Sequence, residues 1–128
     1  MKRHVRDDRG EAVAQLVILT PILVALIFLG VQAAIYFHAA NVAAAAAAQG
    51  AAAASARSAG EGAGTTAATL TIRDLGSTSI GAPVTQAADG YVSVTVTIEV
   101  ARIVPFFPGS VSRTSVEPKE RFISESDR

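Results

Sequence analysis

The sequence predicts an α+β fold, in which one long N-terminal helix is followed by a small antiparallel β-sheet of three or four strands. Three observations predict it. No Asp, Glu, Lys or Arg occurs from Ala12 to Ala56. The later half of this segment is rich in alanine, which has the highest helix propensity of all residues. Further along, apolar and polar residues alternate strictly from Val92 to Val100, which is the period of a strand with one buried face.

Residues 11–37 are predicted to form a transmembrane helix. Beyond Glu11 this stretch is apolar except for two glutamines and one threonine. A helix rises about 1.5 Å per residue, so about 20 residues cross a hydrocarbon core of about 30 Å. Pro21 lies inside the stretch and predicts a kink, because proline removes one backbone hydrogen bond.

The flanking charges predict the direction of the span. Residues 1–10 form a basic leader, and the first basic residue after the span is Arg57. Basic flanks stay in the cytoplasm, so we expect a single-pass protein of the cell membrane with its C-terminal part outside. A cleaved secretory signal peptide is the alternative, with "QAA" or "FHAA" as the cut site. The apolar run exceeds the usual h-region of about 7–15 residues, which favours the anchor. The basic residues of the leader are Lys2, Arg3, Arg6 and Arg9.

Residues 38–64 are predicted to be an alanine-rich extension of the same helix, closed by a glycine-rich turn. The helix is expected to end near Ser58, because "GEGAG" from Gly60 is a stop signal. Small side chains allow another backbone to come close. We therefore expect this part of the helix to be covered, either by the chain's own strands or by neighbouring helices.

Residues 65–123 are predicted to be a small extracytoplasmic β-region, and residues 124–128 a frayed tail. "ADG" at Ala88–Gly90 indicates a turn. Pro118 restricts the last strand to a sheet edge or to its end. A sheet with one valine face needs a cover, and the outer half of the helix is the expected one. Strands are predicted at Thr69–Leu75, Tyr91–Val104 and Val111–Phe122.

The residues that would mark an enzyme are missing from the sequence. The chain has no cysteine, and its two histidines, His4 and His38, lie in the basic leader and at the expected membrane interface. No phosphate loop, metal-ligand spacing or nucleophile motif occurs, so we expect no catalytic residues, cofactor or metal. The formal net charge is zero, which gives the chain no basic footprint for nucleic acid.

A family resemblance rests on the segment "RGEAVAQLVILTPILVALIFLGVQAAIYFHAANVAAAAAAQGA". It resembles the TadE/TadG-like proteins of the tight-adherence (Flp) pilus system, which show an Arg-Gly pair, small residues, a Glu, an apolar stretch with a proline, and an alanine-rich exit. Here Arg9 and Gly10 match the pair, Gln15 stands where the Glu would be, and Pro21 matches the proline. The likeness covers about residues 9–54 and implies a pilin-like fold.

The resemblance also implies a function and partners. It implies a pseudopilin or minor pilin that helps to assemble or anchor an Flp-type pilus, with the membrane, other pilin-like helices, a polytopic platform and a prepilin peptidase as partners. The peptidase would cut between Gly10 and Glu11. Gln15, with Glu11 one turn earlier, would be the polar docking position for other subunits. Two other interpretations stay open: a bitopic protein that binds an envelope ligand, and a β-module secreted after signal-peptide removal.

Overall fold

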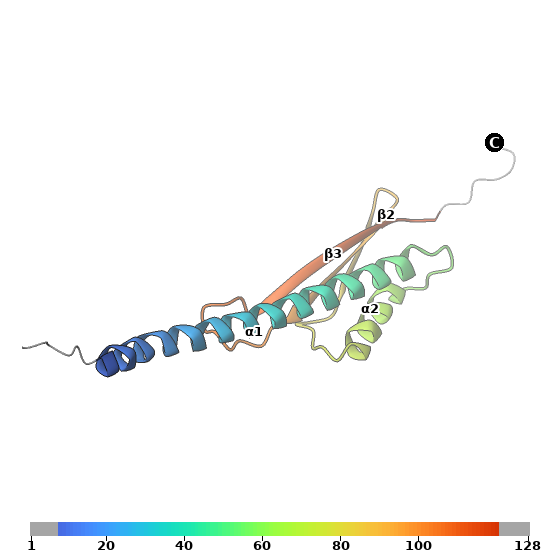
Figure 1. The fold of residues 1–128 in the computed structure, drawn as a ribbon. Coiled ribbons are helices and arrows are strands. Elements are labelled where there is room, and N and C mark those ends of the chain that lie inside the picture. The colour runs from blue at the N-terminus through green and yellow to red at the C-terminus, as the bar shows by residue number, and fades with distance from the viewer. Residues whose placement is uncertain (1–7, 121–128) are drawn as a thin grey trace, which may run out of the picture.

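The computed structural model describes residues 8–120, and within them the chain forms two helices and one three-stranded antiparallel sheet. This confirms the predicted α+β arrangement. Residues 1–7 of the predicted leader and the tail 124–128 lie outside the described part. In Figure 1 the first helix runs through the length of the molecule, and the sheet and second helix gather along its C-terminal half. The elements are α1 (Asp8–Ser55), α2 (Ala63–Asp74), β1 (Val84–Ala88), β2 (Tyr91–Glu99) and β3 (Ser110–Pro118).

Helix α1 joins the predicted span to the alanine-rich segment without a break. It has 48 residues, which corresponds to a length of about 70 Å. The chain stays helical across Pro21, which has no N–H to donate to the Val17 carbonyl. The hydroxyl of the preceding residue, Thr20, donates to the carbonyl of Leu16 at 2.7 Å, one position before the carbonyl that Pro21 leaves without its helical donor. Because one helix serves both segments, the part that packs on the sheet is a rigid continuation of the apolar part.

The predicted strand with one buried face is β2, the central strand of the sheet. It pairs antiparallel with β1 and β3. The β1–β2 hairpin turns at Asp89 and Gly90, whose φ angles are 51° and 80°, as a two-residue turn of the primed type requires. The valine and isoleucine side chains point to the helices, while the intervening serine, threonine and glutamate side chains point outward. The buried apolar residues are Val92, Val94, Val96, Ile98 and, after the strand, Val100.

One face of the alanine-rich half of α1 is covered by the chain's own elements. The alanines on this face are fully buried against β2 and β3 and against α2. Of the two expected covers, the chain's own elements therefore cover that face, and neighbouring helices are not needed there. On the opposite side Ala44, Ala45 and Ala48 are exposed. The fully buried alanines are Ala43, Ala46, Ala47 and Ala51.

The predicted strand at Thr69–Leu75 is wrong, because this segment lies in α2. The residues that α2 buries are Gly64, Ala68 and Ile72, a spacing of four residues that belongs to a helix. The threonine hydroxyls of Thr69 and Thr71 donate to the carbonyls four residues earlier at 2.7 and 2.9 Å, an arrangement open to threonine in a helix.

Helix α2 crosses α1 very closely at a pair of glycines. A Cβ atom on Gly50 would lie 2.8 Å from the Gly64 carbonyl oxygen and 2.9 Å from a methyl carbon of Val94. A Cβ atom on Gly64 would lie 2.9 Å from the Cβ of Ala54. Neither position has room for a side chain, so the glycine inside the alanine-rich helix sets the approach of α2.

Candidate membrane and assembly site

The N-terminal half of α1 exposes large apolar side chains on all sides. From Val13 to Val31 every valine, leucine, isoleucine and phenylalanine is exposed. A helix that is apolar all round belongs in lipid or inside a protein. In the described part of the chain, α1 is the one helix long and apolar enough to cross a membrane. The buried core of the domain begins only at Gln32 and Ala39, beyond the length needed to span.

The predicted processing and docking residues lie in the first two turns of α1. Gly10, Glu11 and Gln15 are all exposed. Glu11 and Gln15 are four residues apart and therefore share one face of the helix. The Gly10–Glu11 bond lies near the start of α1, where a helix end frays most easily. Pro21 lies six residues beyond Gln15, about 9 Å further along the axis, so the structure does not bring it to the same place.

Gln32 is a position with a structural role that the sequence analysis did not predict. It is the single polar residue that the described part of the chain buries completely, with 0% exposure. Its Nε2 donates to the Ala101 carbonyl at 3.1 Å. Its Oε1 accepts the N–H groups of Ile103 at 2.7 Å and Val104 at 3.1 Å. One side chain on α1 thus satisfies three backbone groups of the loop between β2 and β3.

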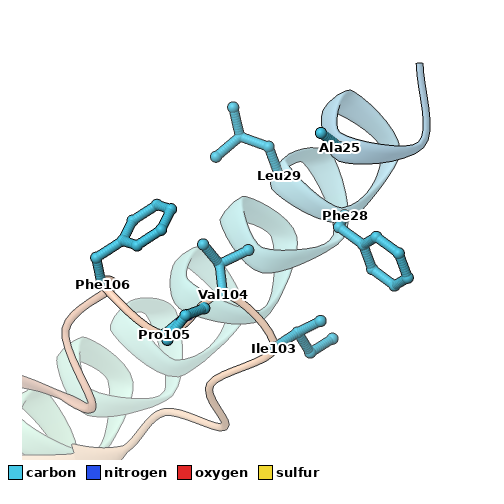
Figure 2. Close-up of a pocket in the computed structure, with 7 residues that line it drawn as sticks. All are labelled: Ala25, Phe28, Leu29, Ile103, Val104, Pro105 and Phe106. Carbon is cyan, nitrogen blue, oxygen red and sulfur yellow. The ribbon is translucent and has the colours of Figure 1, made fainter. Parts of the chain in front are cut away.

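The β2–β3 loop, residues 100–109, extends along α1 toward its apolar half (Figure 1). Its tip is the apolar sequence Ile103–Phe107. In Figure 2, Val104 and Pro105 lie beside the helix, with Phe106 and Leu29 on one side and Ile103 and Phe28 on the other. Together with Ala25 these residues line an open apolar groove of about 390 Å³. Phe106 has 85% of its surface exposed.

Aromatic side chains mark the level at which α1 leaves its apolar segment. The rings of Tyr36 and Phe37 meet edge to face, with centroids 6.2 Å apart. Tyrosine favours the boundary between lipid and water. The next residue, His38, is exposed. These positions lie one to two turns beyond Gln32 and agree with a membrane boundary in this region.

The described residues offer little that resembles a reactive site. Glu99 is exposed on the outer face of β2. Within residues 8–120 there is no group of three or more His, Asp or Glu side chains that could hold a metal ion. What the arrangement does offer is an apolar helix with polar positions at its start, joined rigidly to a small domain.

The fold and the apolar helix define the class: an α+β domain built on the continuation of a membrane-length N-terminal helix. Residues 10–52 match the family model described as TadE-like protein, which confirms the resemblance seen in the sequence. This family is associated with pili and is not enzymatic. The matched segment is α1 from its polar start to the close crossing at Gly50. No curated protein and no solved structure matches the chain.

Proposed function

We propose that the chain is a single-pass pseudopilin or minor pilin that helps to assemble or anchor a Flp-type (Tad) pilus or a related secretion machine. The observation that carries the proposal is the TadE-like match over residues 10–52, because it falls on the apolar helix and its polar start. The N-terminus lies in the cytoplasm, since the first ten residues hold four basic side chains and basic flanks stay inside.

The orientation is tested by labelling, since the chain has no cysteine of its own. The variant Gln86→Cys places one thiol on β1, where the side chain is exposed. A membrane-impermeant maleimide added to intact cells stripped of any outer barrier should label it. Labelling that requires lysis of the cells would place the sheet in the cytoplasm and contradict the proposed topology.

The docking position is tested by co-purification with the pilus machine. A polar group in hydrocarbon seeks a polar partner, so Gln15 and Glu11 supply the polar contact with neighbouring helices or the platform. The variant Gln15→Leu should lower the yield of co-purified machine subunits, and Gln15→Glu should preserve or raise it. Gln49→Leu is the matched control, because Gln49 is an exposed glutamine of the same helix in its sheet-bearing half. Equal yields from Gln15→Leu, Gln15→Glu and Gln49→Leu would exclude a docking role for Gln15.

Processing is a separate part of the proposal. We propose that a prepilin peptidase cuts between Gly10 and Glu11, at the exposed start of α1. Mass spectrometry of the membrane-extracted protein should then find a chain that begins at Glu11. A mature terminus at Met1 throughout would exclude cleavage, while leaving the membrane topology and the docking test unaffected.

The structure argues against a secreted β-module. A signal peptidase acting at "QAA" or "FHAA" would cut α1 between about residues 32 and 41. Ala39 and Ala40 belong to the buried core, and Gln32 holds the β2–β3 loop. Such a cut would remove or fray part of the surface on which the sheet rests.

A bitopic protein that binds an envelope ligand would keep the same membrane topology. Failure to recover any subunit of the pilus machine in the co-purification would favour this alternative.

A further inference from the structure

We infer that the tip of the β2–β3 loop enters the lipid leaflet that faces the sheet, beside α1, and fastens the domain to the membrane surface at a second point. This inference rests on the membrane topology proposed above. The occupant of the groove between loop and helix is then lipid acyl chain. Three features of the structure support it: the depth of the loop, the hydrogen bonds made by most of its tip N–H groups, and its side-chain chemistry.

The depth follows from the position of the groove along α1. The charge-free stretch begins at Ala12, and about 20 helical residues cross a hydrocarbon core of about 30 Å. Ala25 and Leu29, which line the groove, are 13 and 17 residues beyond Ala12. They lie about 20 and 26 Å from the cytoplasmic edge, and so within about 10 Å of the far edge. The loop tip beside them is at the same level.

Three of the four backbone N–H groups in residues 103–107 donate hydrogen bonds within the chain. Loops avoid hydrocarbon because each unpaired N–H or C=O costs several kcal/mol there. At this tip Gln32 bonds the N–H groups of Ile103 and Val104. The N–H of Phe107 donates to the Val104 carbonyl at 3.1 Å, and Pro105 has no N–H at all. A buried glutamine at the expected boundary therefore removes much of the penalty for inserting this loop.

The side chains of the loop are apolar at its tip and basic on its sheet side, which is the order that insertion into a leaflet requires. The exposed groups at the tip are Ile103 and Phe106, which gain from leaving water. Arg102, on the sheet side of the tip, lies over Gly109 and is exposed. Long basic side chains at this level extend to the headgroups while their stems stay in apolar surroundings. The loop thus presents apolar groups to the bilayer interior and one cation to its surface.

Insertion is tested with single-tryptophan variants, because the chain has no tryptophan. The full chain is reconstituted in phosphatidylcholine vesicles with lipids brominated at defined chain depths. Phe106→Trp reports the loop tip. Val116→Trp is the control, since Val116 is exposed on β3 and lies six residues, about 20 Å, from the loop end of that strand. Leu23→Trp reports the middle of the span and is likewise exposed.

The expected result separates this inference from the topology on which it rests. Tryptophan at 106 should be quenched by shallowly brominated lipid at least about threefold more than tryptophan at 116, and should be protected from aqueous iodide. If tryptophan at 23 is quenched by deeply brominated lipid but tryptophan at 106 is as open to iodide as that at 116, the loop inference is wrong and the span stands. If none of the three is quenched by lipid, the membrane topology itself fails. Protection from both lipid bromine and iodide at 106 would mean that another protein copy covers the tip, which also overturns the inference.

Discussion

Replacing Gln32 by methionine should release the β2–β3 loop from α1. Methionine nearly conserves the volume of the side chain but neither donates nor accepts as an amide does. The substitution removes three hydrogen bonds, of 3.1, 2.7 and 3.1 Å, to Ala101, Ile103 and Val104. At about 1 kcal/mol net for each bond, the free energy of opening the loop should fall by about 3 kcal/mol. Since about 1.4 kcal/mol is a factor of ten, this is roughly a hundredfold in the opening equilibrium.

Amide hydrogen exchange of the full chain in detergent micelles measures this opening directly. The N–H groups of Ile103 and Val104 should exchange roughly a hundredfold faster in Gln32→Met than in the unmodified chain. Amides in the middle of β2 should change much less, because their pairing with β1 and β3 does not involve the loop. Gln49→Met is the matched control, since Gln49 is exposed on the same helix and exposed substitutions usually change stability by less than about 0.5 kcal/mol.

The reasoning fails if protection of the two loop amides is unchanged in Gln32→Met. Such a result would mean that the loop is held by the apolar contacts of its tip rather than by the glutamine. It would also weaken the argument that the loop backbone is prepared for lipid. Equal acceleration at the loop and throughout the sheet would instead show that Gln32 supports the whole domain and not this loop in particular.

Three further substitutions test the packing. Gly50→Ala should lower the free energy of unfolding by about 1–3 kcal/mol, and with it the melting temperature in detergent, because the new Cβ would lie 2.8 Å from the Gly64 carbonyl oxygen. Gly30→Ala is the control and should be neutral or stabilising, because a Cβ there has nothing within 4 Å. A larger loss of stability in Gly30→Ala than in Gly50→Ala would refute the close crossing. Asp89→Val should cost about 1–2 kcal/mol in chemical denaturation, because φ is 51° there, whereas Asp89→Asn should stay within about 0.5 kcal/mol. Glu120→Ala should increase exchange of the amide just beyond α1, that of Arg57, by a few fold, because the Glu120 carboxylate accepts this N–H at 3.2 Å; unchanged exchange would show that the bond does not hold the end of the helix in place.

Periodicity predicted the parts of the fold in which side-chain size follows the period. Strand β2 was readable for this reason, whereas the long helix, which is apolar on all sides, was readable from the length of its charge-free run and its alanine content. Helix α2 was not, because its buried positions are occupied by Gly64 and Ala68 as well as Ile72. Glycine and alanine do not stand out as apolar anchors, whereas Leu70 and Ile72 alternate with Thr71 and Arg73 and so predict a strand, although Leu70 is exposed in the structure. Short windows rich in threonine favour the strand interpretation, and only the packing on α1 decides against it.

The glutamine that holds the loop could not be found from motifs. Its partners are backbone groups 69 to 72 residues away, and backbone partners leave no signature in the sequence. Two signals were present all the same. A glutamine inside an apolar stretch has to find a hydrogen-bonding partner, and "RIVPFFP" at residues 102–108 is too apolar for a loop that stays in water. Neither signal shows that Gln32 and this loop are partners, because nothing in the sequence indicates that the loop returns to the helix at the level of Gln32.

A second attachment to the membrane would restrict how neighbouring helices approach α1 in the proposed assembly. At about 100° per residue, the loop-facing residues Leu29, Ala25, Gln32 and Phe28 lie about 40°, 80°, 100° and 140° from Gln15 around the helix axis, so the side that Gln15 faces overlaps the loop only at its margin. The loop covers that side only over the outer turns, where Ala25 and Leu29 line the groove. The side is open nearer the cytoplasm, where Glu11 and Gln15 are exposed. A partner helix that docks on Gln15 therefore has to contact α1 in the cytoplasmic leaflet. In the outer leaflet it has to approach α1 from a side that the β2–β3 loop does not cover. Docking near the cytoplasmic end and fastening of the domain near the other end are then compatible, because they use different depths and only partly overlapping faces of α1.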